Sequence, residues 1–251
     1  MTQETQITID TACGPAGIRL YAIGDIHGRN DLLTIMLEQI RQEIEQDKVK
    51  DWRILFLGDL VDRGPSSRQV LEQLIVCESD PRHIFLAGNH DATFLGFLER
   101  MDMRSPFLMF GGSQTAESYG VDLNQDPEAA YPQLVAAVPQ SHVGFLQRLK
   151  PSAPFGDYFF CHAGIRPGIS LEKQRLDDLQ WIREPFLNYA LPHPVIVVHG
   201  HTPCGNPELH INRINIDTGA FRTGILTALV IENEQRYFLQ ATDTGSVRLD
   251  Q

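Results

Sequence analysis

The sequence predicts an α/β fold with a mixed or doubled β-sheet. Three successive segments each read as an apolar strand, a glycine-framed polar loop and a helix, which is typical of parallel strands joined by right-handed crossovers. Residues 211–249 instead alternate short apolar runs with turns, which favours antiparallel strands. The chain has 251 residues, of which 42% are hydrophobic. A chain of this size can bury a large core without disulfides or a structural metal.

The three repeated units occupy the first hundred residues. Each strand is a short apolar run, and each helix carries apolar residues at helical spacing. The loops between them should gather at the carboxyl ends of the strands, where such sheets place their ligands. The strands and helices are expected at Ile18–Ile23 and from Asn30 or Asp31 onward, at Arg53–Leu57 and Ser66–Cys77, and at His83–Ala87 and Ala92–Arg100.

The pattern changes at about residues 101–150. Prolines, paired glycines and short helical segments replace the repeated strand–loop–helix pattern. We therefore predict a mostly helical, cap-like insert over the loop cluster, with helices at 126–138 and 140–149. Strands return at Tyr158–Cys161 and Val195–Val198, and runs such as Arg213–Ile216 follow with antiparallel character. We expect residues 1–251 to form one catalytic domain with this insert.

Charge and cysteine content limit the classes of partner. The formal net charge is −11, so we expect neither nucleic acid nor an anionic membrane as a partner. Four scattered cysteines form no Cys-x-x-Cys pair, no apolar run is long enough to span a membrane, and Met1–Asp10 lacks a signal pattern. The sequence therefore predicts a cytoplasmic protein with reduced thiols.

Polar side chains follow five of the predicted strands, in positions framed by glycine. Such oxygen and nitrogen donors suit Mn²⁺, Fe or Zn²⁺ better than Ca²⁺. Such a set is too large for one catalytic ion with an open position, but it suits two ions that share a carboxylate, an arrangement used to hydrolyse phosphate esters. The strand-end residues are Asp25 and His27, Asp59, Asn89 and His90, His162, and His201.

Three of these segments carry a resemblance to a known family. Gly24–Gly28 reads Gly-Asp-Ile-His-Gly, Gly58–Gly64 reads Gly-Asp-Leu-Val-Asp-Arg-Gly, and Gly88–Asp91 reads Gly-Asn-His-Asp. In order and spacing they resemble the signature blocks of the metal-dependent serine/threonine phosphoprotein phosphatases, which are calcineurin-like metallophosphoesterases. Later segments resemble the compact bacterial and phage branch. The fold implied is two packed mixed β-sheets flanked by helices.

The resemblance also implies a metal site. Two divalent ions are expected, with Mn²⁺ preferred and Fe or Zn²⁺ as alternatives. Asp59 would bridge the two ions. The first ion would be held by Asp25, His27 and Asp59, and the second by Asp59, Asn89, His162 and His201.

Catalytic roles follow from the same resemblance. A hydroxide that bridges the ions would attack phosphorus in line. His90 would protonate the leaving alkoxide, and Asp62 would orient its ring. Arg63 and Arg183 would grip the phosphoryl oxygens because guanidinium geometry suits that bidentate contact, and Asn89 would assist them in binding substrate.

Three functions remain to be weighed. The first is hydrolysis of phosphoserine and phosphothreonine monoesters in proteins or peptides. The second is symmetrical dinucleoside-tetraphosphate hydrolysis, in a group whose central block typically reads Val-Ala-Arg-Gly. This chain retains Asp62 there, which favours ester hydrolysis because a nucleotide leaving group needs less protonation than an alkoxide. The third, a non-catalytic phosphopeptide-binding module, predicts a missing ligand or acid, and none is missing. Neither the oligomeric state nor the role of the insert follows from the sequence.

Overall fold

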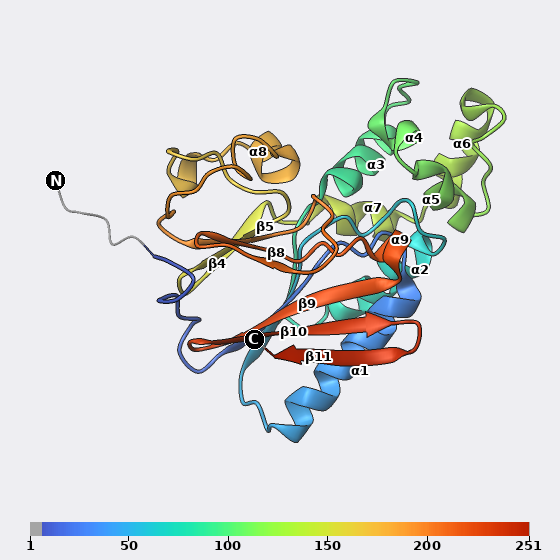
Figure 1. Cartoon of the computed structure of the whole chain (residues 1–251). Coiled ribbons are helices and arrows are strands. Elements are labelled where there is room, and N and C mark those ends of the chain that lie inside the picture. The colour runs from blue at the N-terminus through green and yellow to red at the C-terminus, as the bar shows by residue number, and fades with distance from the viewer. Residues whose placement is uncertain (1–6, 251) are drawn as a thin grey trace.

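The computed structural model describes residues 7–250 as two β-sheets packed against each other, with helices on their outer faces (Figure 1). Side chains of both sheets meet in a shared apolar layer, with Leu20 and Leu55 on one side and Phe160 and Val198 on the other. The predicted arrangement of two packed mixed sheets is thus confirmed. Most of the N-terminal stretch predicted to lack a signal pattern lies outside the described residues.

The first sheet contains the three repeated units and the antiparallel C-terminal strands. β1, β2 and β3 run parallel, and β9 pairs antiparallel with β1. This confirms the parallel strands of the repeats and the antiparallel end of the chain. The order is β11 (Gly245–Asp250), β10 (Gln235–Thr242), β9 (Ile225–Glu232), β1 (Arg19–Ile23), β2 (Trp52–Phe56) and β3 (His83–Phe85).

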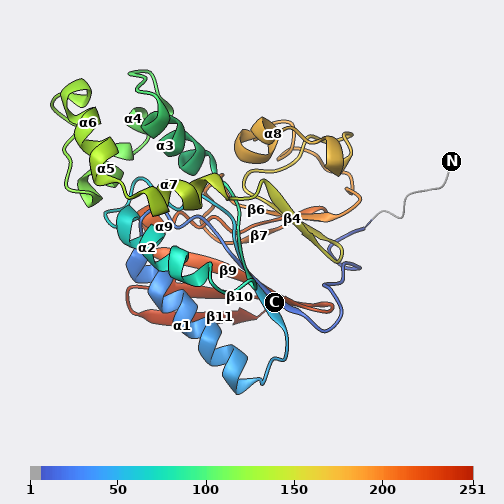
Figure 2. The same ribbon diagram turned by 180° about the vertical axis from the view of Figure 1, so that it is seen from behind.

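Two helices cover the outer face of this sheet. Helix α1 (Asn30–Gln46) turns Leu33, Met36 and Ile40 inward, and α2 (Ser67–Cys77) buries Val70 and neighbouring apolar residues. They pack against Tyr21 and Ile23 of β1 because alternate residues of a strand point to opposite faces. Figure 2 shows α1 and α2 from this side.

The second sheet joins the middle of the chain to its later part. Its strand β8 pairs antiparallel with β7, in line with the antiparallel character expected at Arg213–Ile216, but it also pairs parallel with β6, which was not predicted. The intervening loop and β7 bring the chain back so that β8 starts at the same end as β6. The order is β4 (Ser152–Phe155), β5 (Tyr158–Cys161), β6 (Ile196–His199), β8 (Arg213–Asn215) and β7 (Glu208–Leu209). The 3₁₀ helix η1 (Leu171–Lys173) and α8 (Leu176–Trp181) lie beyond its outer face.

The insert is mostly helical, as predicted, and lies beside the strand ends. We use "the cap" for residues 101–150. Its helices are α4 (Pro106–Met109), α5 (Gly112–Ser118), α6 (Pro127–Ala137) and α7 (Gln140–Gln147). The cap returns to the first sheet at Lys150, whose backbone bonds to Phe85 and Ala87. None of the described helices is long and apolar enough to cross a bilayer.

Helix α3 (Asn89–Glu99) begins three residues earlier than predicted. The Asp91 carboxylate accepts a hydrogen bond from Gly88 N at 2.9 Å and so satisfies a backbone donor at the helix start. Asn89 and His90 therefore stand in the first helical turn, which fixes their direction more firmly than a loop would.

The shared apolar layer should dominate stability. Leu229 on β9 is fully buried between the sheets, so Leu229→Ala should lower the free energy of unfolding by about 2–5 kcal/mol, through lost burial and a residual cavity. Urea unfolding measures this change. The matched control is Leu249→Ala on β11, where the leucine is 37% exposed and the loss should stay within about 0.5 kcal/mol. Equal losses in both variants would contradict this account of the core.

Candidate metal centre and active site

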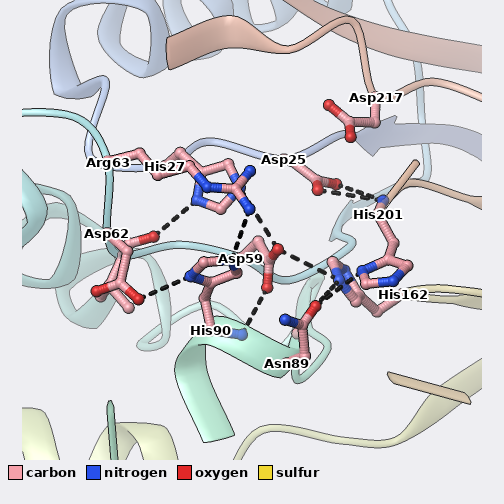
Figure 3. A network of polar contacts seen from close by, with 12 residues as sticks. Asp25, His27, Asp59, Asp62, Arg63, Asn89, His90, His162, His201 and Asp217 are labelled. Carbon is pink, nitrogen blue, oxygen red and sulfur yellow. Dashed lines mark hydrogen bonds and ion pairs between the residues drawn. The ribbon is translucent and has the colours of Figure 1, made fainter. Parts of the chain in front are cut away.

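The strand ends of both sheets converge on one polar cluster (Figure 3). The six predicted metal ligands come together there, and each is 7% exposed or less. Asp25 and His27 follow β1, Asp59 follows β2, Asn89 opens α3, His162 follows β5 and His201 follows β6.

Asp59 lies at the centre of the cluster. Its Oδ2 is 3.4 Å from Nε2 of His27 and 3.4 Å from Nε2 of His162. Its Oδ1 accepts a hydrogen bond from the backbone N–H of His90 at 2.9 Å. One carboxylate thus contacts groups delivered by both sheets, as a shared ligand requires.

The outer ring nitrogens of two histidines are fixed by backbone carbonyls. Nδ1 of His27 donates to Val61 O at 2.8 Å, and Nδ1 of His162 donates to Leu57 O at 2.9 Å. In the neutral rings, Nε2 therefore presents a lone pair toward the Asp59 carboxylate. Nε2 of His27 also lies 2.9 Å from the Arg63 guanidinium, which can donate to it. Nε2 of His162 instead faces two acceptors, Asp59 Oδ2 and Asn89 Oδ1 at 3.0 Å, so in this buried site it must carry a ring proton or bind a metal ion.

A third histidine offers a nitrogen that has no partner. His201 Nδ1 bonds to Asn89 Oδ1 at 2.8 Å, while its Nε2 is buried without a hydrogen-bond partner among the described residues. An unsatisfied buried ring nitrogen is a ready metal ligand. Together with the facing lone pairs at Asp59, it makes the donor set fit divalent ions.

Among the described residues, two groups of donor atoms lie within 4.8 Å of one another: His27, Asp59 and His90, and Asp59, His162 and His201. Asp59 belongs to both groups. The first group contains His90 where the resemblance places Asp25. The Asp25 carboxylate instead accepts a hydrogen bond from His201 N at 3.1 Å.

Burial and charge set the protonation of the cluster. Burial lowers the pKa of His27 to about 3, and burial with the charge of His162 lowers that of His201 to about 3, so both rings are neutral with free lone pairs. Burial opposes a charged His162, but the carboxylates of Asp59 and Asp25 outweigh it and raise its pKa to about 10. His162 thus carries the positive charge that a metal ion can replace.

A further carboxylate, missed by the sequence analysis, faces Asp25 (Figure 3). Asp217 is 2% exposed. Burial, and then the charge of Asp217, raise the pKa of Asp25 well above its usual range. The signal for Asp217 was present, because it follows the apolar residue Ile216 and precedes Gly219, in the same strand-end setting as the other acids.

The predicted acid pair is formed in the structure. Asp62 Oδ2 lies 2.7 Å from Nδ1 of His90. Burial works against a charged His90, but Asp59 and Asp62 outweigh it and raise its pKa. Arg63 points inward and donates to Nε2 of His90 at 2.8 Å and to Nε2 of His27 at 2.9 Å.

Two aromatic rings, also missed from the sequence, border the cluster. Trp181 at the end of α8 is 40% exposed, with its ring centre 6.2 Å from that of His201. Phe221 on α9 (Ala220–Thr223) lies 5.4 Å from the His27 ring and 4.9 Å below the Arg63 guanidinium. Arg183 follows α8 and is exposed, and its charge contributes to the lowered pKa of His201.

The site residues sit in a strained backbone. Seven non-glycine residues of the described chain have positive φ, and five of them belong to this site, at about 1–3 kcal/mol of strain each. The glycines of the motifs allow the close approaches that hold these loops. A Cβ at Gly88 would overlap Asp59, and one at Gly200 would overlap Asp25 Oδ1. The five residues are His27, Asp59, Asp62, Arg63 and His201.

Residues 18–222 match the calcineurin-like phosphoesterase family. The chain therefore belongs to that family of metallophosphoesterases, whose members are metal-dependent phosphoester hydrolases. This confirms the sequence prediction of a hydrolase of the metallophosphoesterase type.

Individual relatives differ in the activity their names state. The chain is 27% identical over 232 residues to bis(5'-nucleosyl)-tetraphosphatase PrpE [asymmetrical] of Anoxybacillus flavithermus, covering 82% of this chain and 88% of that one. It is 25% identical to serine/threonine-protein phosphatase 2 of Salmonella typhimurium, covering 85% and 93%. The crystal structure of a candidate diadenosine tetraphosphatase shares the fold, with a TM-score of 0.65 at 18% identity over 92% of this chain and 99% of that one.

Removing the central carboxylate should abolish both metal positions. Asp59→Ala leaves His27 and His162 without the anion that they share, so the variant should bind less than one divalent ion per chain at saturating Mn²⁺. Elemental analysis after gel filtration measures this ratio. Asp177→Ala, at an exposed acid on α8, is the control and should bind as the unaltered protein does. Two ions retained by Asp59→Ala would contradict the bridging assignment.

Metal uptake should release protons. The folded, metal-free protein keeps a proton on His162 up to a pKa of about 10, and an ion needs that lone pair, so Mn²⁺ binding at pH 7 should release about one proton or more. Apparent affinity should accordingly rise with pH up to about 10. Calorimetry in two buffers of different ionisation enthalpy counts the protons. Identical heats in both buffers would show that no protonated ligand is displaced.

Proposed function

We propose that this metallophosphoesterase hydrolyses dinucleoside tetraphosphates with two divalent ions bound, Mn²⁺ being preferred. The sequence alone ranked phosphoprotein hydrolysis first and the symmetrical form of this activity second. The similarity to the Anoxybacillus tetraphosphatase across most of both chains supports the reverse order. The chemistry remains attack of water on phosphorus, and the change concerns only the leaving group.

The geometric observation that carries the proposal is the pair of aromatic rings. Trp181 stands beside His201 and Phe221 beside His27, and these two histidines lie at opposite ends of the cluster in Figure 3. Stacking of a base on an aromatic ring contributes about 1–3 kcal/mol. A substrate with a nucleoside at each end of a phosphate chain can therefore place its phosphates at the donor cluster and its bases at the two rings.

Local cations must hold this polyanion against the net charge of −11. Divalent ions, when bound, would polarise the phosphoryl oxygens and lower the pKa of water. Arg63 supplies the nearest guanidinium. It now donates to ring nitrogens of His27 and His90. A phosphoryl oxygen is a stronger acceptor for a charged donor, so substrate should draw Arg63 away from them. Arg183 adds an exposed cation at the rim.

Release of Arg63 also frees His90 for proton transfer. Its Nδ1 stays bonded to Asp62, while Nε2 becomes available to carry a proton toward the leaving oxygen. A nucleotide leaving group needs this proton only weakly. An alkoxide needs it strongly.

A second candidate function is therefore hydrolysis of phosphoserine and phosphothreonine in proteins. The observation that favours it is the 2.7 Å contact between Asp62 and His90, an acid pair that an alkoxide leaving group uses more fully. The similarity to the Salmonella serine/threonine phosphatase supports the same candidate.

Direct competition between the substrates tests the proposal. With Mn²⁺, kcat/KM should be at least about tenfold higher for diadenosine tetraphosphate than for a phosphothreonine peptide, equivalent to about 1.4 kcal/mol in transition-state binding. Chromatography of the products identifies the bond broken, since two diphosphates indicate symmetrical cleavage and ATP with AMP asymmetrical cleavage. Preference for the peptide would reverse the ranking.

The matched variant is Trp181→Ala. Loss of the ring should raise KM for the dinucleotide about 5- to 100-fold, in line with one lost stacking contact, and leave para-nitrophenyl phosphate nearly unchanged. An equal effect on both substrates would remove the geometric support for nucleotides.

A further inference from the structure

The cap meets the catalytic loop at two consecutive residues, Asp62 and Arg63. Both have left-handed backbone, with φ of 71° and 68°, and neither is glycine. Such a pair is unfavourable in isolation and persists only where surrounding contacts impose it. The partners that impose it come largely from the cap, a segment with no predicted ligand or acid.

The backbone of both residues is held by the start of α5. Arg63 N donates to Gly111 O at 3.0 Å, and Asp62 N donates to the Thr115 hydroxyl at 2.9 Å. The approach is close, because a Cβ on Gly111 would lie 2.8 Å from both Cγ and N of Arg63. The cap is thus fitted against the catalytic loop rather than lying above it.

The Thr115 hydroxyl also holds the Asp62 side chain. Its oxygen is 2.7 Å from Asp62 Oδ1, and since a carboxylate only accepts, Thr115 gives its single proton to Asp62. The Ser67 hydroxyl, 3.0 Å away, must then donate to Thr115. Thr115 therefore accepts from Ser67 and from Asp62 N and donates to Asp62 Oδ1, so its hydrogen-bonding capacity is fully used.

These contacts are shielded from water. Asp62, Ser67 and Thr115 are each 0% exposed, so no solvent molecule can replace the bond that Thr115 supplies. Thr115 itself is held in place, because its neighbour Ala116 belongs to the same buried apolar cluster as Phe107. A hydroxyl fixed on a packed helix can define an orientation in a way that a surface hydroxyl cannot.

The two carboxylate oxygens of Asp62 have different partners. Oδ1 is bound by Thr115, and Oδ2 is bound by Nδ1 of His90 at 2.7 Å. With Oδ1 fixed, the carboxylate cannot rotate about its Cβ–Cγ bond, so Oδ2 stays on the His90 ring. The ring in turn directs Nε2 toward the position of the leaving group.

We propose that Thr115 of the cap is a positioning residue for proton donation, acting through Asp62 on His90. The inference rests on the acid role of His90 given under the proposed function, and it adds no chemical step because Thr115 contacts neither the metal ligands nor the substrate phosphate. It gives the cap a catalytic role beyond covering the site.

The experiment compares leaving groups. Thr115→Val keeps the shape and removes the hydroxyl, and in the Mn²⁺-loaded enzyme it should lower kcat for an alkyl phosphate about 10- to 100-fold, as expected for a misplaced catalytic group. Para-nitrophenyl phosphate, whose leaving group hardly needs a proton, should change by less than about threefold. Thr115→Ser restores the hydroxyl and should recover most of the alkyl activity.

A second measurement does not depend on turnover. In ¹⁵N-labelled metal-free protein, the His90 Nδ1 proton bonded to Asp62 should give a downfield resonance, which Thr115→Val should lose or shift upfield and Thr115→Ser should retain. Should the valine variant fail to fold, Thr115→Ala provides the same comparison. The control is Thr227→Val, which removes another fully buried hydroxyl, one bonded to Thr218 and Gln240, and should leave the leaving-group ratio unchanged.

Two variants together distinguish the acid role of His90 from the positioning role of Thr115. His90→Asn tests the acid itself and should discriminate alkyl from aryl substrates more strongly than Thr115→Val. If His90→Asn slows both substrates equally, the acid role proposed above is wrong. If His90→Asn discriminates but Thr115→Val slows both equally, or neither, then Thr115 is only structural and this inference alone is overturned.

Discussion

The central constraint on this structure is the burial of one carboxylate, that of Asp59. A buried carboxylate is stable only with cationic or hydrogen-bonding partners. Asp59 finds them in His27 after β1, His162 after β5 and the backbone of His90. The two histidines come from different sheets, so the contact exists only when the sheets pack in one relative position. The apolar layer that sets this packing therefore also sets the metal site.

The same convergence explains why the loops tolerate unfavourable backbone. Five site residues adopt the left-handed conformation without being glycine, and local sequence preference alone would not keep them there. The motif glycines stand where neighbouring loops touch, as at Gly88 against Asp59. The strained backbone of the site residues is thus held by close contacts between the loops, as is common where a site is preorganised for chemistry.

The cap is in direct contact with this centre. At its inner end, Gly111 and Thr115 bond to the residues that the proposed mechanism uses for phosphate binding and for orienting the acid. An insert without a motif of its own thus reaches the residues that we propose bind phosphate and orient the acid, in a family whose relatives carry names for both anhydride and ester hydrolysis.

The sequence alone determined the repeated strand–loop–helix units and the six donors at the strand ends, while the pairing of Asp62 with His90 was implied by the resemblance to a known family. The strand–loop–helix units and the donors follow from local sequence patterns, namely short apolar runs and polar residues flanked by glycine. Tertiary structure decided the parallel pairing of β8 with β6, the start of α3 at Asn89 and the presence of Trp181 and Phe221 around the cluster. It also decided the contact of Thr115 with Asp62, residues 53 positions apart. Contacts between such distant segments arise from how the sheets and the cap pack, and no local pattern records them.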